Sequence, residues 1–167
     1  MTEGTVLLEP PGKAAMEQFG QWVEGPAEAG QRTFYSEALS THPPDSVAVL
    51  HVNHVARSPL PHRVSRVECH PYASQCFFPL DVSRYAVVVM PSGANGQPLP
   101  EQARGFIVPG TIGVIFHPRV WHLGATVFDR PGCFSVLMWR GGKLADDQFI
   151  DISPQTLVVA EPGAGDG

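Results

Sequence analysis

The chain has 167 residues, of which 43% are hydrophobic and 16% are charged, and this balance predicts one globular domain rather than a disordered chain. The formal net charge is −5 with 11 Lys and Arg residues, so we do not expect a nucleic-acid partner, which would need a basic face. The sequence contains no apolar run of about 18 residues, so no membrane-spanning helix is predicted, and its first residues show no secretory signal.

The predicted elements begin with a short strand at residues 6–8, which a pair of prolines ends. Residues 13–23 are predicted to form a helix, because apolar side chains recur on one face at helical spacing: Ala15, Phe19, Trp22 and Val23. Residues 25–46 are polar and rich in turn formers, and we expect one strand there near residues 33–35.

From residue 47 onward, short apolar runs alternate with turns that contain Pro and Gly. The runs predict strands at residues 47–52, 63–68, 75–78, 85–90, 105–108, 113–117 and 133–139. Such a series predicts an all-β fold, an antiparallel sandwich or barrel, with a short N-terminal helix. We expect residues 1–160 to form a single domain and residues 161–167 to form a flexible tail.

The three cysteines are odd in number and lack the spacing of a zinc site, which favours reduced thiols and a cytoplasmic protein: Cys69, Cys76 and Cys133. Cys69 lies beside the candidate site described next. A nucleophilic role would need a partnered base, and the alternative interpretation is a small buried side chain.

The candidate site residues lie in two segments. Residues 113–122 run from a Gly through a short apolar strand and a Pro turn to His122. In the earlier segment, Glu68 and His70 share one face of a strand because they are two residues apart, and Gln75 follows. These spacings resemble the two signatures of the cupin family. The resemblance implies that the four side chains converge inside a jelly-roll type β-barrel.

Two chemistries remain open for this set. Glu68, His70 and His122 can hold a divalent metal such as Ni²⁺ or Mn²⁺, although Gln75 stands where an anionic ligand would bind more strongly. Alternatively, the same side chains form a metal-free acid/base site, because an imidazole can take or give a proton near neutral pH. A histidine that only packs in the core is the structural alternative for His122.

Two longer segments, residues 67–90 and 104–122, resemble motifs of the ureidoglycolate lyase family in the same order and spacing. The first contains Glu-Cys-His-Pro and the second ends in Trp-His, and Arg140 falls where the family has an Arg-Gly pair. The resemblance implies a cupin-like barrel, usually a homodimer. It further implies a carbon–nitrogen lyase of the amidine-lyase class, which splits the small molecule ureidoglycolate into urea and glyoxylate during allantoin and purine catabolism.

This reaction needs a base, an acid and a cation, because one carbon of ureidoglycolate carries a hydroxyl, a ureido nitrogen and a carboxylate. We expect His122 and His70 to be the acid/base pair, in an order that the sequence leaves open. Glu68 would orient one of them or act as the base itself. Gln75 would hydrogen-bond the ureido group.

Two arginines are candidates for the substrate carboxylate, because a guanidinium meets a carboxylate through two parallel hydrogen bonds. Arg104 is the first candidate and Arg140 is the second. An ion pair on the surface or at a dimer interface is the alternative role for each of them.

Three positions depart from the family motifs: Cys69 replaces an Arg, Leu123 replaces a second His, and Trp139 replaces a frequent Asp. Strand alternation predicts that Cys69 and Leu123 point away from the site. Because lost polar groups can also change the substrate, two other hypotheses stay open. One is a diverged cupin-like protein that binds a small organic acid without ureidoglycolate turnover, and the other is a metal-dependent isomerase or dioxygenase.

Overall fold

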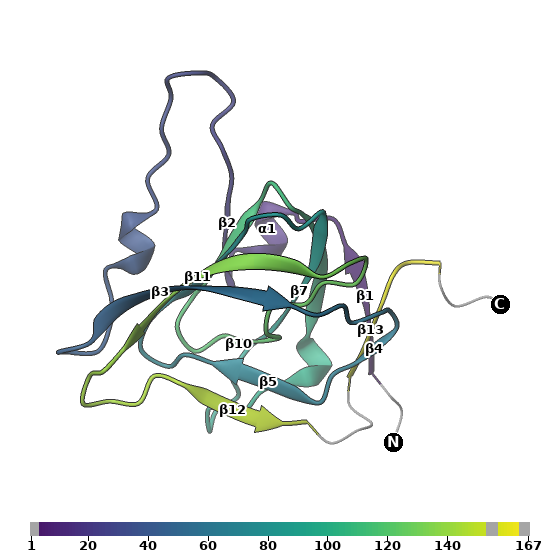
Figure 1. Cartoon of the computed structure of the whole chain (residues 1–167). Coiled ribbons are helices and arrows are strands. Elements are labelled where there is room, and N and C mark those ends of the chain that lie inside the picture. The colour runs from purple at the N-terminus through teal and green to yellow at the C-terminus, as the bar shows by residue number, and fades with distance from the viewer. Residues whose placement is uncertain (1–3, 153–156, 164–167) are drawn as a thin grey trace.

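Two curled β-sheets face each other around one interior in the computed structural model, which describes residues 4–152 and 157–163 (Figure 1). The larger sheet has, in spatial order, β12 (Gln148–Asp151), β5 (Arg66–Cys69), β10 (Trp121–His122), β7 (Arg84–Met90), β8 (Arg104–Pro109), β1 (Gly4–Glu9), β13 (Leu157–Ala160) and β4 (His62–Arg63). The smaller sheet has β2 (Gly20–Val23), β9 (Gly113–Phe116), β6 (Gln75–Pro79), β11 (Gly132–Arg140) and β3 (Val47–Val55).

Neighbouring strands are antiparallel except at β1, which runs parallel to β8 and to β13. The described helices are short: α1 (Lys13–Met16), and two 3₁₀ turns, η1 (Ser36–Leu39) and η2 (Pro100–Gln102). The predicted all-β, cupin-like barrel with a short N-terminal helix is therefore confirmed.

The central strand β7 explains how the barrel is packed. Its side chains alternate between two apolar clusters: Tyr85, Val87 and Val89 lie in the interior between the sheets, whereas Ala86, Val88 and Met90 lie in a second cluster on the other face. A strand that is buried on both faces needs a continuous apolar sequence, and residues 85–90 provide one. The interior cluster also contains Phe77 of β6 and Phe116 of β9, so both sheets contribute to it.

The predicted helix over residues 13–23 is wrong beyond its first turn. Helix α1 ends at Met16, and residues 20–23 form strand β2, which pairs with β9. Phe19 and Trp22 are buried as their apolar character requires, but Phe19 lies in the turn after α1 and Trp22 lies in the extended backbone of β2. Pairing with the open edge of β9 gives these residues ladder hydrogen bonds, which outweighs a helical pattern interrupted by Gly20.

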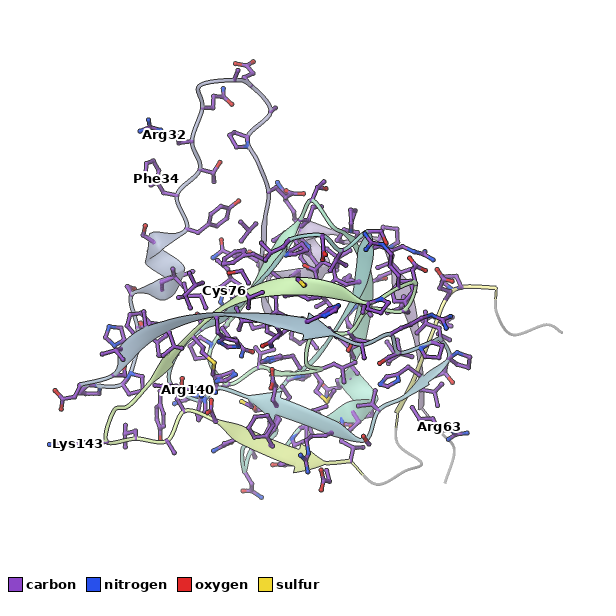
Figure 2. The ribbon with its side chains drawn as sticks, in the orientation of Figure 1. Arg32, Phe34, Arg63, Cys76, Arg140 and Lys143 are labelled. Carbon is purple, nitrogen blue, oxygen red and sulfur yellow. The ribbon has the colours of Figure 1, made fainter. Side chains whose placement is uncertain are left out.

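The predicted strand near residues 33–35 is also wrong, because these residues form no strand. They belong to a long segment between β2 and η1 that projects from the barrel (Figure 1). Arg32 and Phe34 point outward from this segment, and Phe34 is 79% exposed (Figure 2). A tether near its base is the hydroxyl of Tyr35, which donates to the carbonyl of Glu24.

Other predicted strands are confirmed with shifted ends, and the predicted strand at residues 63–68 is divided into β4 and β5. Besides β2, three strands were not predicted: β10, which has only two residues, β12, which is exposed along its length, and β13. Of the proposed tail, residues 164–167 lie outside the described residues, whereas Glu161 accepts a hydrogen bond from Arg84 at 2.6 Å. Within the described residues, no helix has the length and apolar character needed to cross a membrane.

The tight contact between β2 and β9 can be tested at Gly20. A Cβ placed on Gly20 would lie 2.0 Å from the carbonyl oxygen of Ile115, so Gly20→Ala must push β2 away from β9. We expect the variant to lose about 2 kcal/mol of unfolding free energy and its Tm to fall by about 4–8 °C. Gly25→Ala is the matched control, because its Cβ would meet no atom within 4 Å, and its Tm should equal that of the wild type. An unchanged Tm for Gly20→Ala would contradict this packing.

Candidate functional site

His122 occupies the centre of the site and is completely buried. Its strand, β10, pairs with β5 so that His122 lies directly opposite Glu68. The imidazole stacks on Phe116 with ring centroids 4.0 Å apart, and the edge of Phe77 packs near it. These contacts fix the ring plane and so determine where its two nitrogens point.

Both nitrogens of His122 face oxygen acceptors. Nδ1 lies 3.0 Å from the carbonyl oxygen of Val120, and Nε2 lies 2.8 Å from Oε1 of Gln75 and 3.1 Å from Oε1 of Glu68. A ring in this position can donate from both nitrogens when it is protonated. The arrangement therefore suits an imidazole that carries a proton on Nε2.

Glu68 is the anionic partner of this imidazole. Burial alone would raise the pKa of its carboxyl, but the hydrogen bond from His122 and the charges of His122 and His70 outweigh burial, so the pKa lies below the usual value. Glu68 is thus held as a carboxylate between the two histidines.

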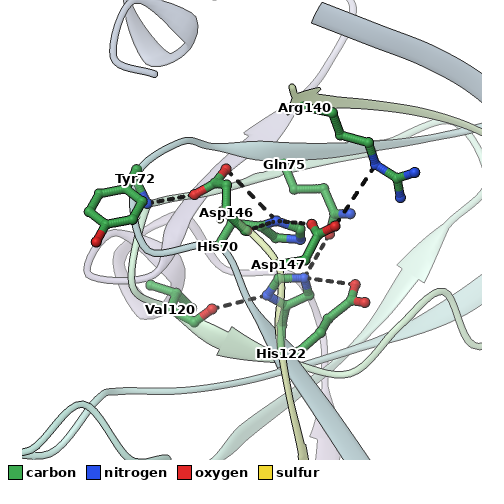
Figure 3. A network of polar contacts seen from close by, with 9 residues as sticks. His70, Tyr72, Gln75, Val120, His122, Arg140, Asp146 and Asp147 are labelled. Atoms are coloured by element: carbon green, nitrogen blue, oxygen red, sulfur yellow. Dashed lines mark hydrogen bonds and ion pairs between the residues drawn. The ribbon is translucent and has the colours of Figure 1, made fainter. Parts of the chain in front are cut away.

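Contacts at Nδ1 orient the ring of His70. Its Nδ1 donates to the carbonyl oxygen of Asp146 at 2.7 Å and lies 3.3 Å from a carboxylate oxygen of Asp147 (Figure 3). Nε2 is buried and has no hydrogen-bond partner among the described residues. Burial, followed by the nearby His122, lowers the pKa of His70, so the neutral ring is favoured and Nε2 presents a lone pair.

A cavity of about 200 Å³ lies beside these groups. It is lined by His51, Asn53, Glu68, His70, Gln75, Phe77, Gly124, Ala125, Val136, Met138, Arg140, Asp147 and Phe149. Two larger surface grooves, of about 530 and 540 Å³, contain none of the predicted site residues, and a third, of about 300 Å³, contains only Arg140 of them. The small cavity is therefore the candidate site, since it combines enclosure with titratable groups.

The structure brings together all but one of the predicted site residues. Glu68, His70, Gln75 and Arg140 line the cavity, and His122 is hydrogen-bonded to two of them. Arg104 lies elsewhere. It begins strand β8, forms an ion pair with Glu9 and is not among the residues that line this cavity.

Sequence reasoning missed three polar residues that line the cavity: His51 and Asn53 of β3, and Asp147, which directly precedes β12. His51 and Asn53 alternate along β3 with the exposed Leu50 and Val52, and this period of two was a readable signal for a common inward face. Asp147 carried no comparable signal, because nothing in the sequence shows that the residues after Arg140 fold back against His70.

The three departures from the family motifs do not line the cavity. Cys69 and Leu123 belong to the apolar cluster on the other face of β7, which confirms that they point away from the site. Burial, with the charge of Asp146, raises the pKa of the Cys69 thiol to about 12, so the structure does not favour a nucleophilic thiolate. Trp139 stacks on His42, with centroids 3.8 Å apart.

The donor atoms of Glu68, His70 and His122 all lie within 4.8 Å of one another. The unpartnered, buried Nε2 of His70 is available as a ligand, and its Nδ1–H is held by a carbonyl, as in the histidine ligands of metal sites. Two imidazoles and one carboxylate fit a divalent transition metal ion. The residues therefore fit a metal as well as a proton-transfer site.

Comparisons with known proteins show the family of the chain. A family model described as "Ureidoglycolate lyase" matches residues 4–158. Proteins named ureidoglycolate lyase are similar to the chain: that of Azotobacter vinelandii is 32% identical over 160 residues, covering 90% of this chain and 95% of the relative. That of Pseudomonas paraeruginosa is 29% identical over 163 residues, covering 92% of this chain and 95% of the relative. The chain belongs to the ureidoglycolate lyase family.

Proposed function

We propose that this protein is a ureidoglycolate lyase that releases urea and glyoxylate by acid/base catalysis. The observation that carries the proposal is the convergence of His70, a carboxylate, an amide and an arginine around one small cavity, with His122 hydrogen-bonded to the carboxylate and the amide. In the reaction, the hydroxyl O–H breaks, its electron pair forms the carbonyl of glyoxylate, and the carbon–nitrogen electron pair leaves with urea. One proton is removed from oxygen and one is delivered to nitrogen.

His70 is the proposed base. Its Nδ1–H donates to the carbonyl of Asp146, so the lone pair of Nε2 is available to accept a proton. A neutral imidazole whose basic nitrogen lacks a competing partner can accept the hydroxyl proton directly.

His122 is the proposed acid. Glu68 and Gln75 both present oxygen atoms to its Nε2, so a proton on that nitrogen is stabilised until the leaving nitrogen accepts it. Glu68 acts as the positioning carboxylate between the two rings. Gln75 can also turn its amide toward the ureido group of the substrate.

Arg140 is the proposed cation for the substrate carboxylate. It lines the cavity from the end of β11 and is 58% exposed on its side chain, so its guanidinium can meet a ligand that enters from solvent. Its fork geometry suits a bidentate contact with a carboxylate. Arg104, paired with Glu9 outside this cavity, is left out of the proposal.

A divalent ion is the second interpretation of the same residues. Glu68, His70 and His122 would hold it, and Ni²⁺ or Mn²⁺ suits this set of ligands. When bound, such an ion supplies positive charge that stabilises a substrate oxygen as it loses its proton.

We also propose that the protein acts as a homodimer in the cytoplasm, in allantoin catabolism, as the family resemblance implies. Strand β3 is an edge of the smaller sheet, and Leu50 and Val52 on its outer face are 68% and 61% exposed. A second copy that covers this face would remove the apolar side chains from water. The free cysteines, two of them buried, are consistent with a reducing compartment.

The activity is tested with racemic ureidoglycolate, by following glyoxylate release against a control without protein. We expect clear acceleration that stops when half of the substrate is consumed, because an asymmetric site distinguishes the two enantiomers. The assay is repeated after exhaustive chelation and again with added Mn²⁺ or Ni²⁺. These two conditions distinguish a metal-free proton-transfer site from a metal-dependent one. A rate equal to the control in all three conditions would contradict the proposal and favour an organic-acid binder.

The assigned roles predict different kinetic losses. His122→Ala should lower kcat by about 10²- to 10⁴-fold, because it removes the proton donor. Arg140→Gln should mainly raise KM, by about ten- to a hundredfold, because it removes a charge-assisted contact to the carboxylate. Arg104→Gln should change neither constant. A larger effect of Arg104→Gln than of Arg140→Gln would overturn the assignment of the carboxylate site.

The dimer face is tested by Leu50→Glu, which places a charge on the exposed face of β3. We expect the variant to sediment as a monomer in analytical ultracentrifugation, whereas the wild type sediments as a dimer, because an interface disfavours an unpaired buried charge. Leu7→Glu is the matched control, since Leu7 is 57% exposed on β1, and it should remain dimeric. A monomeric wild type would refute the dimer.

A further inference from the structure

The carboxylate of Asp147 lies between the proposed base and the proposed carboxylate-binding arginine. One oxygen is 3.3 Å from Nδ1 of His70, and the other is 3.9 Å from Nε of Arg140 (Figure 3). Both contacts are ion pairs without a close hydrogen bond, because the Nδ1–H of His70 is directed to the carbonyl oxygen of Asp146, but the carboxylate lies nearer to His70 than to Arg140. Asp147 therefore contacts His70 through one oxygen and Arg140 through the other, and the contact with His70 is the shorter.

Two features fix Asp147 in this place. Strand β12 begins at the next residue and pairs antiparallel with β5, with Gln148 opposite Cys69, so the register places Asp147 across from His70. The buried carboxylate of Asp146 accepts the backbone N–H of Tyr72 at 2.7 Å, which ties the same segment to the turn after His70. The contact with His70 is thus supported by the backbone on both sides.

The contact with Arg140 is the weaker of the two. The Arg140 side chain is 58% exposed, and a partly exposed ion pair at 3.9 Å contributes little stability. An incoming carboxylate that offers two close hydrogen bonds to the guanidinium can therefore displace Asp147 from it. Asp147 would then face only Nδ1 of His70.

We propose that Asp147 is a positioning residue that exchanges partners when substrate binds: it releases Arg140 to the substrate carboxylate and remains on His70. The inference rests on the proposed assignment of Arg140 to the substrate carboxylate. An anion at Nδ1–H strengthens electron donation from Nε2, whether that nitrogen takes a proton or holds an ion. Asp147 thus weakens ground-state binding while it supports the chemical step.

The two effects predict opposite changes on substitution. Asp147→Asn should lower kcat by about tenfold, because His70 loses the nearer of the two carboxylates beside its Nδ1 and keeps only that of Asp146, at 4.0 Å. The same variant should bind oxalurate, a non-reacting compound with a ureido group and a carboxylate, about two- to fivefold more tightly than the wild type, because Arg140 no longer has a competing anion. Damage to the fold would weaken binding and turnover together.

Oxalurate binding is measured by titration calorimetry, and turnover is measured by glyoxylate release. Asp147→Glu keeps the charge and should restore most of kcat. In the Arg140→Gln background, Asp147→Asn should give no gain in oxalurate affinity, which separates release of Arg140 from simple removal of a repelling charge. Asp151→Asn, the same change at an exposed residue of β12 paired with Arg66, is the matched control and should behave as the wild type.

Each outcome supports or overturns the inference. Tighter oxalurate binding by Asp147→Asn that depends on Arg140, together with a lower kcat, supports it. Unchanged or weaker binding, a gain that persists without Arg140, or a wild type that does not bind oxalurate overturns it. A wild type that binds oxalurate but does not accelerate glyoxylate release refutes the lyase function alone, because the binding measurements remain decisive for the partner exchange.

Discussion

The hydrogen-bonded pairing of β10 with β5 is the constraint on which the site depends. It places a buried imidazole opposite a carboxylate, with His122 and Glu68 in register, in a strand of only two residues. Such a short strand cannot hold its own position, so the ring is fixed by packing on Phe116 and by the neighbouring β7. A buried polar group needs its partners, and here the partners are the groups that a proton transfer requires.

From that pairing the remaining geometry follows in steps. Because Glu68 is in register with His122, His70 comes to the same face two residues later, and β6 brings Gln75 from the other sheet. The register of β12 against β5 then places Asp147 beside His70. The site is therefore assembled by both sheets, including the edge strand β12 of the larger one, rather than by a single loop.

The sequence was sufficient where a local spacing determines the direction of a side chain. Glu68 and His70 could be assigned to one face because strand alternation is a property of the backbone. The fold class was readable from the many short apolar runs. Local spacing predicted the wrong element for residues 17–23, because pairing of β2 with the edge of β9 overrides the helical period of the apolar residues. It also could not predict the position of Asp147, which depends on the register between β12 and β5, strands that are distant in the sequence.

The two arginines show the same limit and explain how the family departures can be tolerated. Arg104 and Arg140 are equivalent by charge, but only the end of β11 reaches the cavity, while the start of β8 is opposite β1 and its Glu9. Likewise, Cys69 and Leu123 replace polar family residues on the face of the larger sheet that packs in the second apolar cluster. A change from polar to apolar on that face alters packing behind the site, whereas the proposed acid, the proposed base and the proposed carboxylate-binding cation all lie on the other face. The chemistry of ureidoglycolate cleavage can therefore survive substitutions that alter two of the family motifs.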